Sequence, residues 1–259
     1  MGGSVAALTL QTALAAAAGL VALGFSMSTF ERWLRGRRRH ELAWSVSLAM
    51  FTLGSAALWL GAANGWSASV FRAFYLFGAI LNVPFLALGT IYLLGSRRLG
   101  DLVGAGVALA SAFATGILVA SPLHGSVPAH ELPRGSEVFG PLPRILAAVA
   151  SGLAALVVIG GALWSAWRLR AGPRAGFVGS TSRMFAANVL IALGTIVLGI
   201  GGLFNSALGE MEAFAVTLVI GITLIFAGFL VATQGAARGA PATSGERKGD
   251  ELPLTHLVQ

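Results

Sequence analysis

The sequence contains no cysteine, a single lysine and few charged residues of any kind. The absence of cysteine excludes a disulfide framework, a thiol nucleophile and a thiolate metal site. Charged residues make up 10% of the 259 residues and hydrophobic residues 56%, whereas a soluble globular protein has about 25% charged residues. The chain therefore lacks the polar surface that a soluble domain of this length requires.

Apolar segments, each about as long as a bilayer crossing, fill most of the chain, and short polar stretches separate them. We predict an all-α fold, an integral membrane bundle of seven transmembrane helices within residues 1–234. The predicted spans are 5–29, 43–63, 71–94, 102–121, 145–167, 184–207 and 214–233. We expect 235–259 to be a disordered cytoplasmic tail, because it is polar, rich in small residues and unpatterned.

The basic residues fall mainly on one side of the predicted membrane. Fourteen of the 17 lysine and arginine residues lie there, including the five arginines of the run Glu31–Arg39. Positively charged loops stay in the cytoplasm, so we predict the N-terminus outside and the C-terminus inside. The net charge of +7 then reflects topology, and we expect no nucleic-acid partner. The segment Arg35–Arg39 is a candidate contact for anionic lipids of the bilayer.

No Asp, Glu, Lys or His falls well inside a predicted span. A proton-coupled carrier usually needs such a group, and a retinal protein needs a lysine in its last helix. The one lysine, Lys248, lies in the predicted tail, which excludes a retinal Schiff base. Paired histidines for a membrane haem are also missing, because we expect all four histidines in loops or in the tail. They are His40, His124, His130 and His256.

No known catalytic motif or phosphate-binding loop is present. We therefore predict that the protein is not an enzyme and has no cofactor. The predicted outer loop, 122–144, holds five prolines and should be irregular. Its histidines and carboxylates match no metal-binding spacing, so we expect no metal site. They are His124, His130, Glu131 and Glu137.

The third span, 71–94, carries Asn82 and Pro84 near its middle. Proline frees a main-chain carbonyl, and a carboxamide in hydrocarbon needs hydrogen-bond partners. Two interpretations stay open: a polar face lining a cavity, or a kinked helix whose Asn82 bonds a neighbouring helix. The candidate residues for a polar cavity are Arg72, Tyr75, Asn82, Pro84, Gln11 and Asn188.

Seven spans permit two parallel three-helix repeats joined by the fourth span. The second span contains Leu53-Gly54-Ser55 and the sixth contains Leu193-Gly194-Thr195, at a constant offset of 140 residues. Parallel repeats are one way in which transporters are built. Because leucine and glycine are so common here, chance similarity stays an open alternative.

The stretch Tyr75-Leu76-Phe77-Gly78-Ala79, followed by Leu88–Leu94, resembles a segment of multi-pass membrane proteins of high-GC bacteria. No activity is assigned to that group, so the resemblance implies a bacterial inner (plasma) membrane protein and no site residues. The topology also resembles that of small sugar transporters with three-helix repeats. We predict a carrier or channel for a small neutral solute. The alternative is a non-catalytic sensor or scaffold that acts through its basic cytoplasmic loops, and a homo-oligomer is left open.

Overall fold

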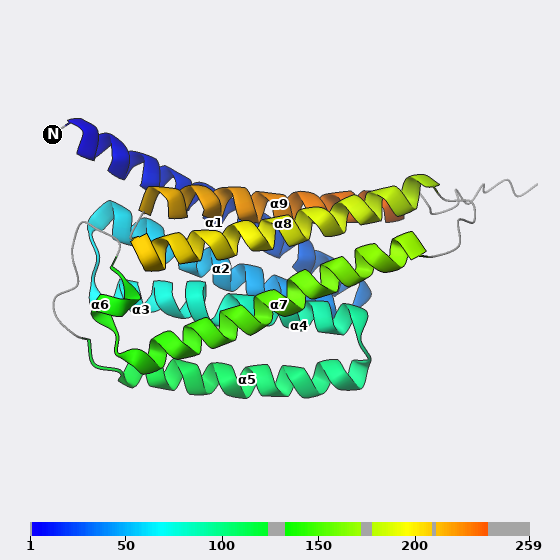
Figure 1. The fold of residues 1–259 in the computed structure, drawn as a ribbon, viewed down its shortest axis with the longest axis horizontal. Helices are drawn as coiled ribbons and strands as arrows, with labels where there is room; N and C mark the ends of the chain where they lie inside the picture. The colour runs from blue at the N-terminus through cyan, green and yellow to red at the C-terminus, as the bar shows by residue number, and fades with distance from the viewer. Residues whose placement is uncertain (1, 124–132, 172–177, 209–210, 238–259) are drawn as a thin grey trace, which may run out of the picture.

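The computed structural model describes residues 2–123, 133–171, 178–208 and 211–237. These residues are predominantly helical and form no named strand, which confirms the predicted all-α fold. Seven helical rods in them are long and apolar enough to cross a membrane, and they run side by side (Figure 1). The candidate spans are Thr12–Gly36, Arg39–Asn64, Ala68–Leu94, Arg97–Ala120, Pro141–Arg168, Phe185–Gly202 and Phe214–Val231.

The third rod is built from three consecutive segments, and each of the other six is one continuous helix. In the third rod, α3 and α4 flank the π-helical segment η1, which has wider turns than an α-helix. The elements in chain order are α1 (Gly2–Gly36), α2 (Arg39–Asn64), α3 (Ala68–Phe74), η1 (Tyr75–Leu81), α4 (Asn82–Leu94), α5 (Arg97–Ala120), α6 (Gly135–Val138), α7 (Pro141–Ala171), α8 (Val178–Leu208) and α9 (Met211–Ala237).

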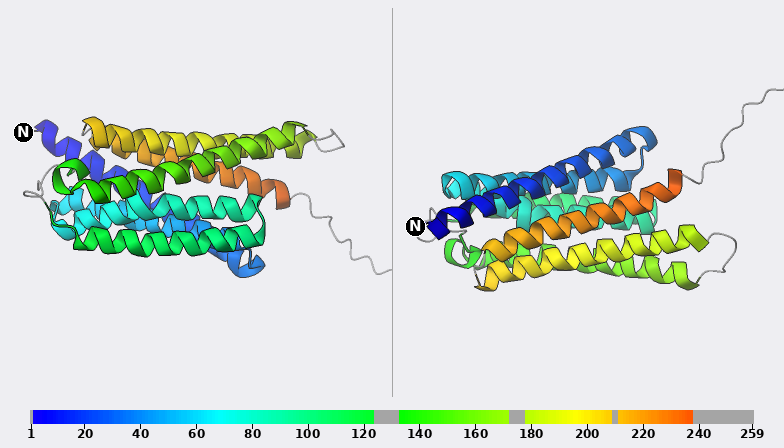
Figure 2. Two further views of the ribbon diagram at one scale, coloured as in Figure 1. Left: turned by 60° about the horizontal axis from the view of Figure 1, so that its bottom comes forward. Right: turned by 90° about the horizontal axis from the view of Figure 1, so that it is seen from above.

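Six of the rods pack as a ring. Going round it, α1 packs on α2, α2 on the α3–η1–α4 rod, that rod on α7, α7 on α8, α8 on α9, and α9 again on α1. The remaining helix, α5, lies outside the ring and packs on α4, α7 and η1 (Figures 1 and 2). This order is the one that two three-helix repeats joined by a separate fourth helix would give, and the repeat itself stays a prediction.

Glycines allow close approach within each half of the ring. A Cβ atom on Gly54 of α2 would lie 3.0 Å from the main-chain nitrogen of Gly78 in η1. A Cβ atom on Gly194 of α8 would lie 2.6 Å from the carbonyl oxygen of Gly221 in α9. Helices in membranes associate through such small residues, because the backbones can then make van der Waals contact. Gly54 and Gly194, which are 140 residues apart, thus each lie where the second rod of their half meets the third.

The two ends of the bundle are closed differently. At one end, α1 continues to Gly36 and α2 begins at Arg39, so the basic run is mostly helical. Arg37 takes a left-handed conformation with φ 51°, which makes the tight turn between the two helices. The prediction that His40 lies in a loop is wrong, because α2 already begins at Arg39, before the apolar stretch. The charged residues in this first turn have partners, and His40 lies next to Glu41. His124, His130 and His256 lie outside the described residues.

At the opposite end, the segment expected to be irregular contains the short helix α6, and α7 already begins at Pro141. Proline is compatible with the first helical turn, where its missing N–H would have no partner. Phe139, just after α6, is buried and stacks on Phe71 with ring centroids 5.3 Å apart. A bridge from Leu123 to Phe139 ties this segment to the end of α5, so α6 covers one end of the bundle (Figure 1).

Candidate functional site

The backbone around Pro84 is held by side chains from neighbouring helices. Ser47 of α2 donates a hydrogen bond to the carbonyl of Asn82 over 2.7 Å, and the Trp44 indole N–H donates to the carbonyl of Leu86 over 3.2 Å. Ser151 of α7 donates to the carbonyl of Ala79. Proline in a membrane helix is tolerated where neighbouring side chains satisfy the disturbed backbone. The third rod is therefore fixed at its irregular point by α2 and α7.

Asn82 lies at the junction of η1 and α4 and is 7% exposed. Its carboxamide Oδ1 is fully enclosed, and no hydrogen-bond donor reaches it among the described residues. The hydrogen bond between Asn82 and α2 is accepted by the main-chain carbonyl of Asn82, so it does not satisfy Oδ1. Such an acceptor costs about 1–3 kcal/mol in a protein interior, so a bound water or solute would stabilise it.

A small cavity begins one helical turn beyond Asn82. Its volume is about 60 Å³, and it lies between α2, α4, α7, α8 and α9, in the half of the bundle nearer the α1–α2 turn. The lining residues are Trp44, Leu86, Thr90, Leu93, Leu94, Val158, Gly161, Ala162, Ser165, Asn188, Ile191, Ile225 and Phe229. None of them carries a charge.

Two of the polar groups that line the cavity already donate hydrogen bonds to the same main-chain carbonyl. The Trp44 indole N–H and the Thr90 hydroxyl both donate to the carbonyl of Leu86, at 3.2 Å and 3.4 Å. On the opposite wall, the Asn188 amide donates to the Ser165 hydroxyl oxygen over 2.9 Å. A hydroxyl and a carboxamide can each donate and accept hydrogen bonds. This pair is therefore the polar part of one wall of the cavity.

The candidate residues from the sequence do not form one polar face. Asn188 lines the cavity, and Asn82 and Pro84 lie just outside it on the third rod. Arg72 and Tyr75 belong to the α6 end of the bundle instead, because they precede Asn82 by ten and seven residues along the third rod. The side chain of Gln11 lies outside the described residues.

Arg72 and Tyr75 take part in the packing of the α6 end. The Arg72 guanidinium donates from Nη2 to the carbonyl of Ser121 over 2.7 Å, which ties α3 to the end of α5. The Tyr75 ring packs on Phe139 at 5.0 Å between centroids. A Cβ atom on Gly135 would lie only 2.8 Å from the Tyr75 ring, so α6 sits directly on this side chain. Tyr75 is thus covered by the segment around α6, and Arg72 joins α3 to the end of α5.

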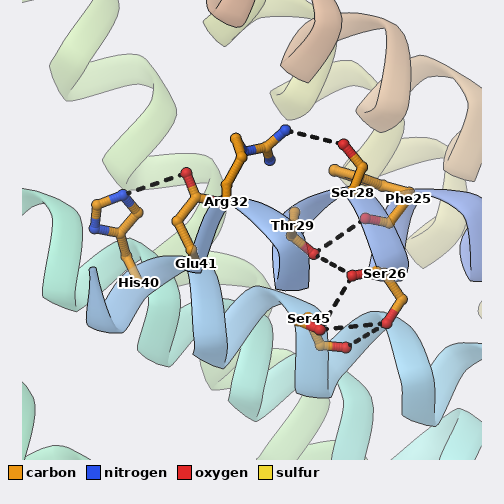
Figure 3. Close-up of polar contacts among 8 residues, drawn as sticks. All are labelled: Phe25, Ser26, Ser28, Thr29, Arg32, His40, Glu41 and Ser45. Carbon is orange, nitrogen blue, oxygen red and sulfur yellow. Dashed lines mark hydrogen bonds and ion pairs between the residues drawn. The ribbon is translucent and has the colours of Figure 1, made fainter. Parts of the chain in front are cut away.

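A charged cluster at the α1–α2 turn was not predicted from the sequence. Glu41, near the start of α2, is buried, and its Oε2 accepts from Nε of Arg32 in α1 over 3.1 Å. His40 approaches the other carboxylate oxygen at 3.8 Å, and Arg32 also donates to Ser28 (Figure 3). The predicted second span begins at residue 43, so Glu41 lies outside it, whereas α2 already begins at Arg39.

Serine and threonine side chains lie next to this cluster (Figure 3). The Ser26 hydroxyl donates to the carbonyl of Ser45 over 2.9 Å, and the Ser45 hydroxyl donates to the carbonyl of Ser26 over 3.1 Å. The Thr29 hydroxyl returns to the carbonyls of its own helix. The reciprocal bonds fix the register of α1 against α2 directly beside the ion pair.

The basic run Arg35–Arg39 is exposed but partly engaged. Arg35 pairs with Glu31, Arg39 pairs with Asp101 of α5, and the Arg37 guanidinium lies 4.8 Å from the centre of the Trp33 ring. Contact of this run with anionic lipids stays a prediction. Near the opposite end of the bundle, Glu137 forms an ion pair with Arg134, while His124, His130 and Glu131 lie outside the described residues.

Comparison with known proteins identifies no relative of this chain: no family model matches it, and neither a curated protein nor a solved structure shows significant similarity.

Proposed function

We propose that this multi-pass membrane protein carries or conducts a small neutral solute across the bacterial plasma membrane. The observation that supports the proposal most directly is the cavity between α2, α4, α7, α8 and α9, which combines apolar walls with the Asn188–Ser165 pair and has no charged lining residue. A binding site of this composition selects a solute by shape and by a few placed polar groups. The third rod, whose α4 lines the cavity, also carries the unsatisfied acceptor Oδ1 of Asn82 one turn away.

The size of the cavity limits its occupant. At about 60 Å³, the cavity has room for a few water molecules or one solute of a few heavy atoms. A donor and an acceptor side by side suit a primary amide, a urea or a small alcohol. With the N-terminus outside, as the basic residues favour, the cavity lies in the cytoplasmic half of the membrane.

The test is solute flux into proteoliposomes, followed by stopped-flow light scattering with water, urea, acetamide and glycerol as the probes. Asn188→Leu should slow the flux of the accepted solute about three- to tenfold, because one hydrogen bond to the solute is lost. Thr115→Val on the peripheral helix α5 is the matched control, since Thr115 bonds only its own helix at the carbonyl of Ser111. Absence of protein-dependent flux for the whole panel would favour the sensor or scaffold alternative.

A further inference from the structure

Arg32 depends on Glu41 for its charge compensation. Its Nε makes the ion pair and its Nη1 bonds the Ser28 hydroxyl, but its Nη2 is enclosed and has no hydrogen-bond partner among the described residues. The ion pair therefore uses one nitrogen of the guanidinium and one oxygen of the carboxylate. Such a single-point pair is weaker than a two-point pair, so a second cation near Glu41 would compete with Arg32 for the carboxylate.

His40 is placed to supply that second cation. Its Nε2 lies 3.8 Å from Oε1 of Glu41, the oxygen that Arg32 leaves unused. At this distance a neutral imidazole makes no hydrogen bond, whereas an imidazolium is attracted to the carboxylate. Histidine changes its charge between about pH 5 and pH 8. Glu41 is thus bound by one cation when His40 is neutral and shared between two when His40 is protonated.

The same cluster touches the wall of the solute cavity at two places. The His40 ring packs against the Trp44 ring with centroids 5.1 Å apart, and Trp44 lines the cavity. The Arg32 guanidinium lies 5.8 Å from the centre of the Phe229 ring, which also lines the cavity and meets Trp44 edge to face at 4.6 Å. The two aromatic rings separate the charged cluster from the solute site.

We propose that His40 is a proton-binding site whose charge state is transmitted to the cavity wall through Trp44 directly and through Glu41, Arg32 and Phe229. Protonation draws Glu41 towards His40 and loosens its bond to Arg32, so the contact of α1 with α9 at Phe229 changes with pH. The residues Ser26 and Ser45, which join α1 and α2 by reciprocal hydrogen bonds, keep the two helices in place meanwhile.

The other charges near His40 are accounted for. In the linker, Arg37 lies over Trp33, and Arg38 is exposed but near enough to repel an imidazolium at His40, as Arg32 also does. Arg39 pairs with Asp101 of α5, which also accepts from the Tyr92 hydroxyl of α4 over 3.0 Å. The part of α9 whose side chains are described, 214–231, contains no charged residue. Glu41 is therefore the carboxylate in direct reach of His40, and Arg32 is its competitor.

The test is a pH titration of tryptophan fluorescence on the full-length protein in lipid nanodiscs, purified without a histidine tag. An imidazolium in contact with an indole quenches its emission. The Trp44 signal is taken as the difference between the wild type and Trp44→Phe. We expect this signal to fall as the pH is lowered from about 8, and the titration continues to below about pH 5 because burial of His40 disfavours its charged form. Glu41→Gln should move the transition to lower pH, because the carboxylate that favours the imidazolium is gone.

Two substitutions at His40 separate proton binding from packing. His40→Gln keeps a polar side chain, and His40→Phe keeps an aromatic ring against Trp44; both should abolish the transition while the helical circular dichroism is retained. His256→Gln, outside the described residues, is the control and should leave the transition unchanged. A Trp44 signal that does not change with pH, or one that persists in either His40 variant, overturns the proposal. The titration needs no transported solute, so its outcome is separate from that of the flux assay.

Discussion

Ser47 of α2 donates its hydroxyl hydrogen to the main-chain carbonyl of Asn82, 2.7 Å away, while the carboxamide oxygen of Asn82 has no donor among the described residues. The polar contact between α2 and the third rod is therefore made by the backbone of Asn82, and the side chain contributes nothing to it. Two consequences for stability follow, and they differ in sign for the two residues.

Ser47→Ala should destabilise the protein by about 0.5–1.5 kcal/mol, because the Asn82 carbonyl loses its donor in a buried position. Ser47 is itself buried, so water cannot easily replace the lost bond. The measurement is reversible unfolding in mixed micelles with increasing SDS. Thr115→Val on α5 removes a hydroxyl that bonds within its own helix and should cost less. Equal losses in the two variants would show that the interhelical bond has no special weight.

Asn82→Leu should leave stability unchanged or raise it, because it replaces an unsatisfied carboxamide oxygen with an apolar group of similar size. An Asn82 that bonds a neighbouring helix would instead cost about 0.6–2 kcal/mol on removal. The same micelle unfolding measurement distinguishes the two cases. A clear loss of stability would mean that the carboxamide has a structural partner, for example a buried water, and would count against its being available to a solute.

The sequence was informative where one residue type is unusual for its surroundings. Asn82, Pro84 and Asn188 are polar or helix-disturbing residues in apolar segments, and the structure puts one of them in the cavity and the other two beside it. The donors that satisfy the third rod, Ser47 and Ser151, gave no such signal. Serine is common in membrane helices, and only the packing of α2 and α7 against the rod gives these two a function.

Trp44 and Glu41 show the limit of reading spans from hydropathy. Tryptophans near helix ends are expected at the membrane interface, yet Trp44 is buried and donates to a carbonyl inside the bundle. Glu41 precedes the apolar run, so hydropathy predicts a span that begins after it, whereas α2 begins at Arg39. Its partner, Arg32, is nine residues away in α1. A buried charge that is paired across two helices cannot be recognised from either helix alone.

Glu41→Gln should destabilise the protein by about 1–3 kcal/mol at neutral pH. Removing one member of a fully buried ion pair costs about 3–5 kcal/mol, and the smaller value reflects Arg32, whose side chain is 27% exposed. Glu31→Gln is the matched control. Glu31 and Arg35 form an exposed ion pair at the end of α1, and such pairs contribute little to stability. Thermal unfolding in nanodiscs gives both values, and equal melting temperatures for the two variants would contradict the structural weight of Glu41.

Gly194→Ala should destabilise the contact of α8 with α9. The added Cβ atom would lie 2.6 Å from the carbonyl oxygen of Gly221 and 2.9 Å from the main-chain nitrogen of Ile225, so the two backbones must move apart. Overpacking of this kind costs about 1–3 kcal/mol. Gly199→Ala in the same helix is the matched control, because its Cβ atom meets nothing within 4 Å. It should be neutral or gain up to about 1 kcal/mol, since alanine favours the helix.

Gly54→Ala extends this comparison to the other half of the ring. Its Cβ atom would lie 3.0 Å from the main-chain nitrogen of Gly78, so the loss should have the same sign as that of Gly194→Ala and be smaller. Two equivalent three-helix units require both contacts to matter, because each joins the second and third rods of its own unit. The wild type and the variants Gly54→Ala, Gly194→Ala and Gly199→Ala are compared by unfolding in SDS micelles. A Gly54 variant as stable as Gly199→Ala would remove the glycine contacts as support for an internal repeat.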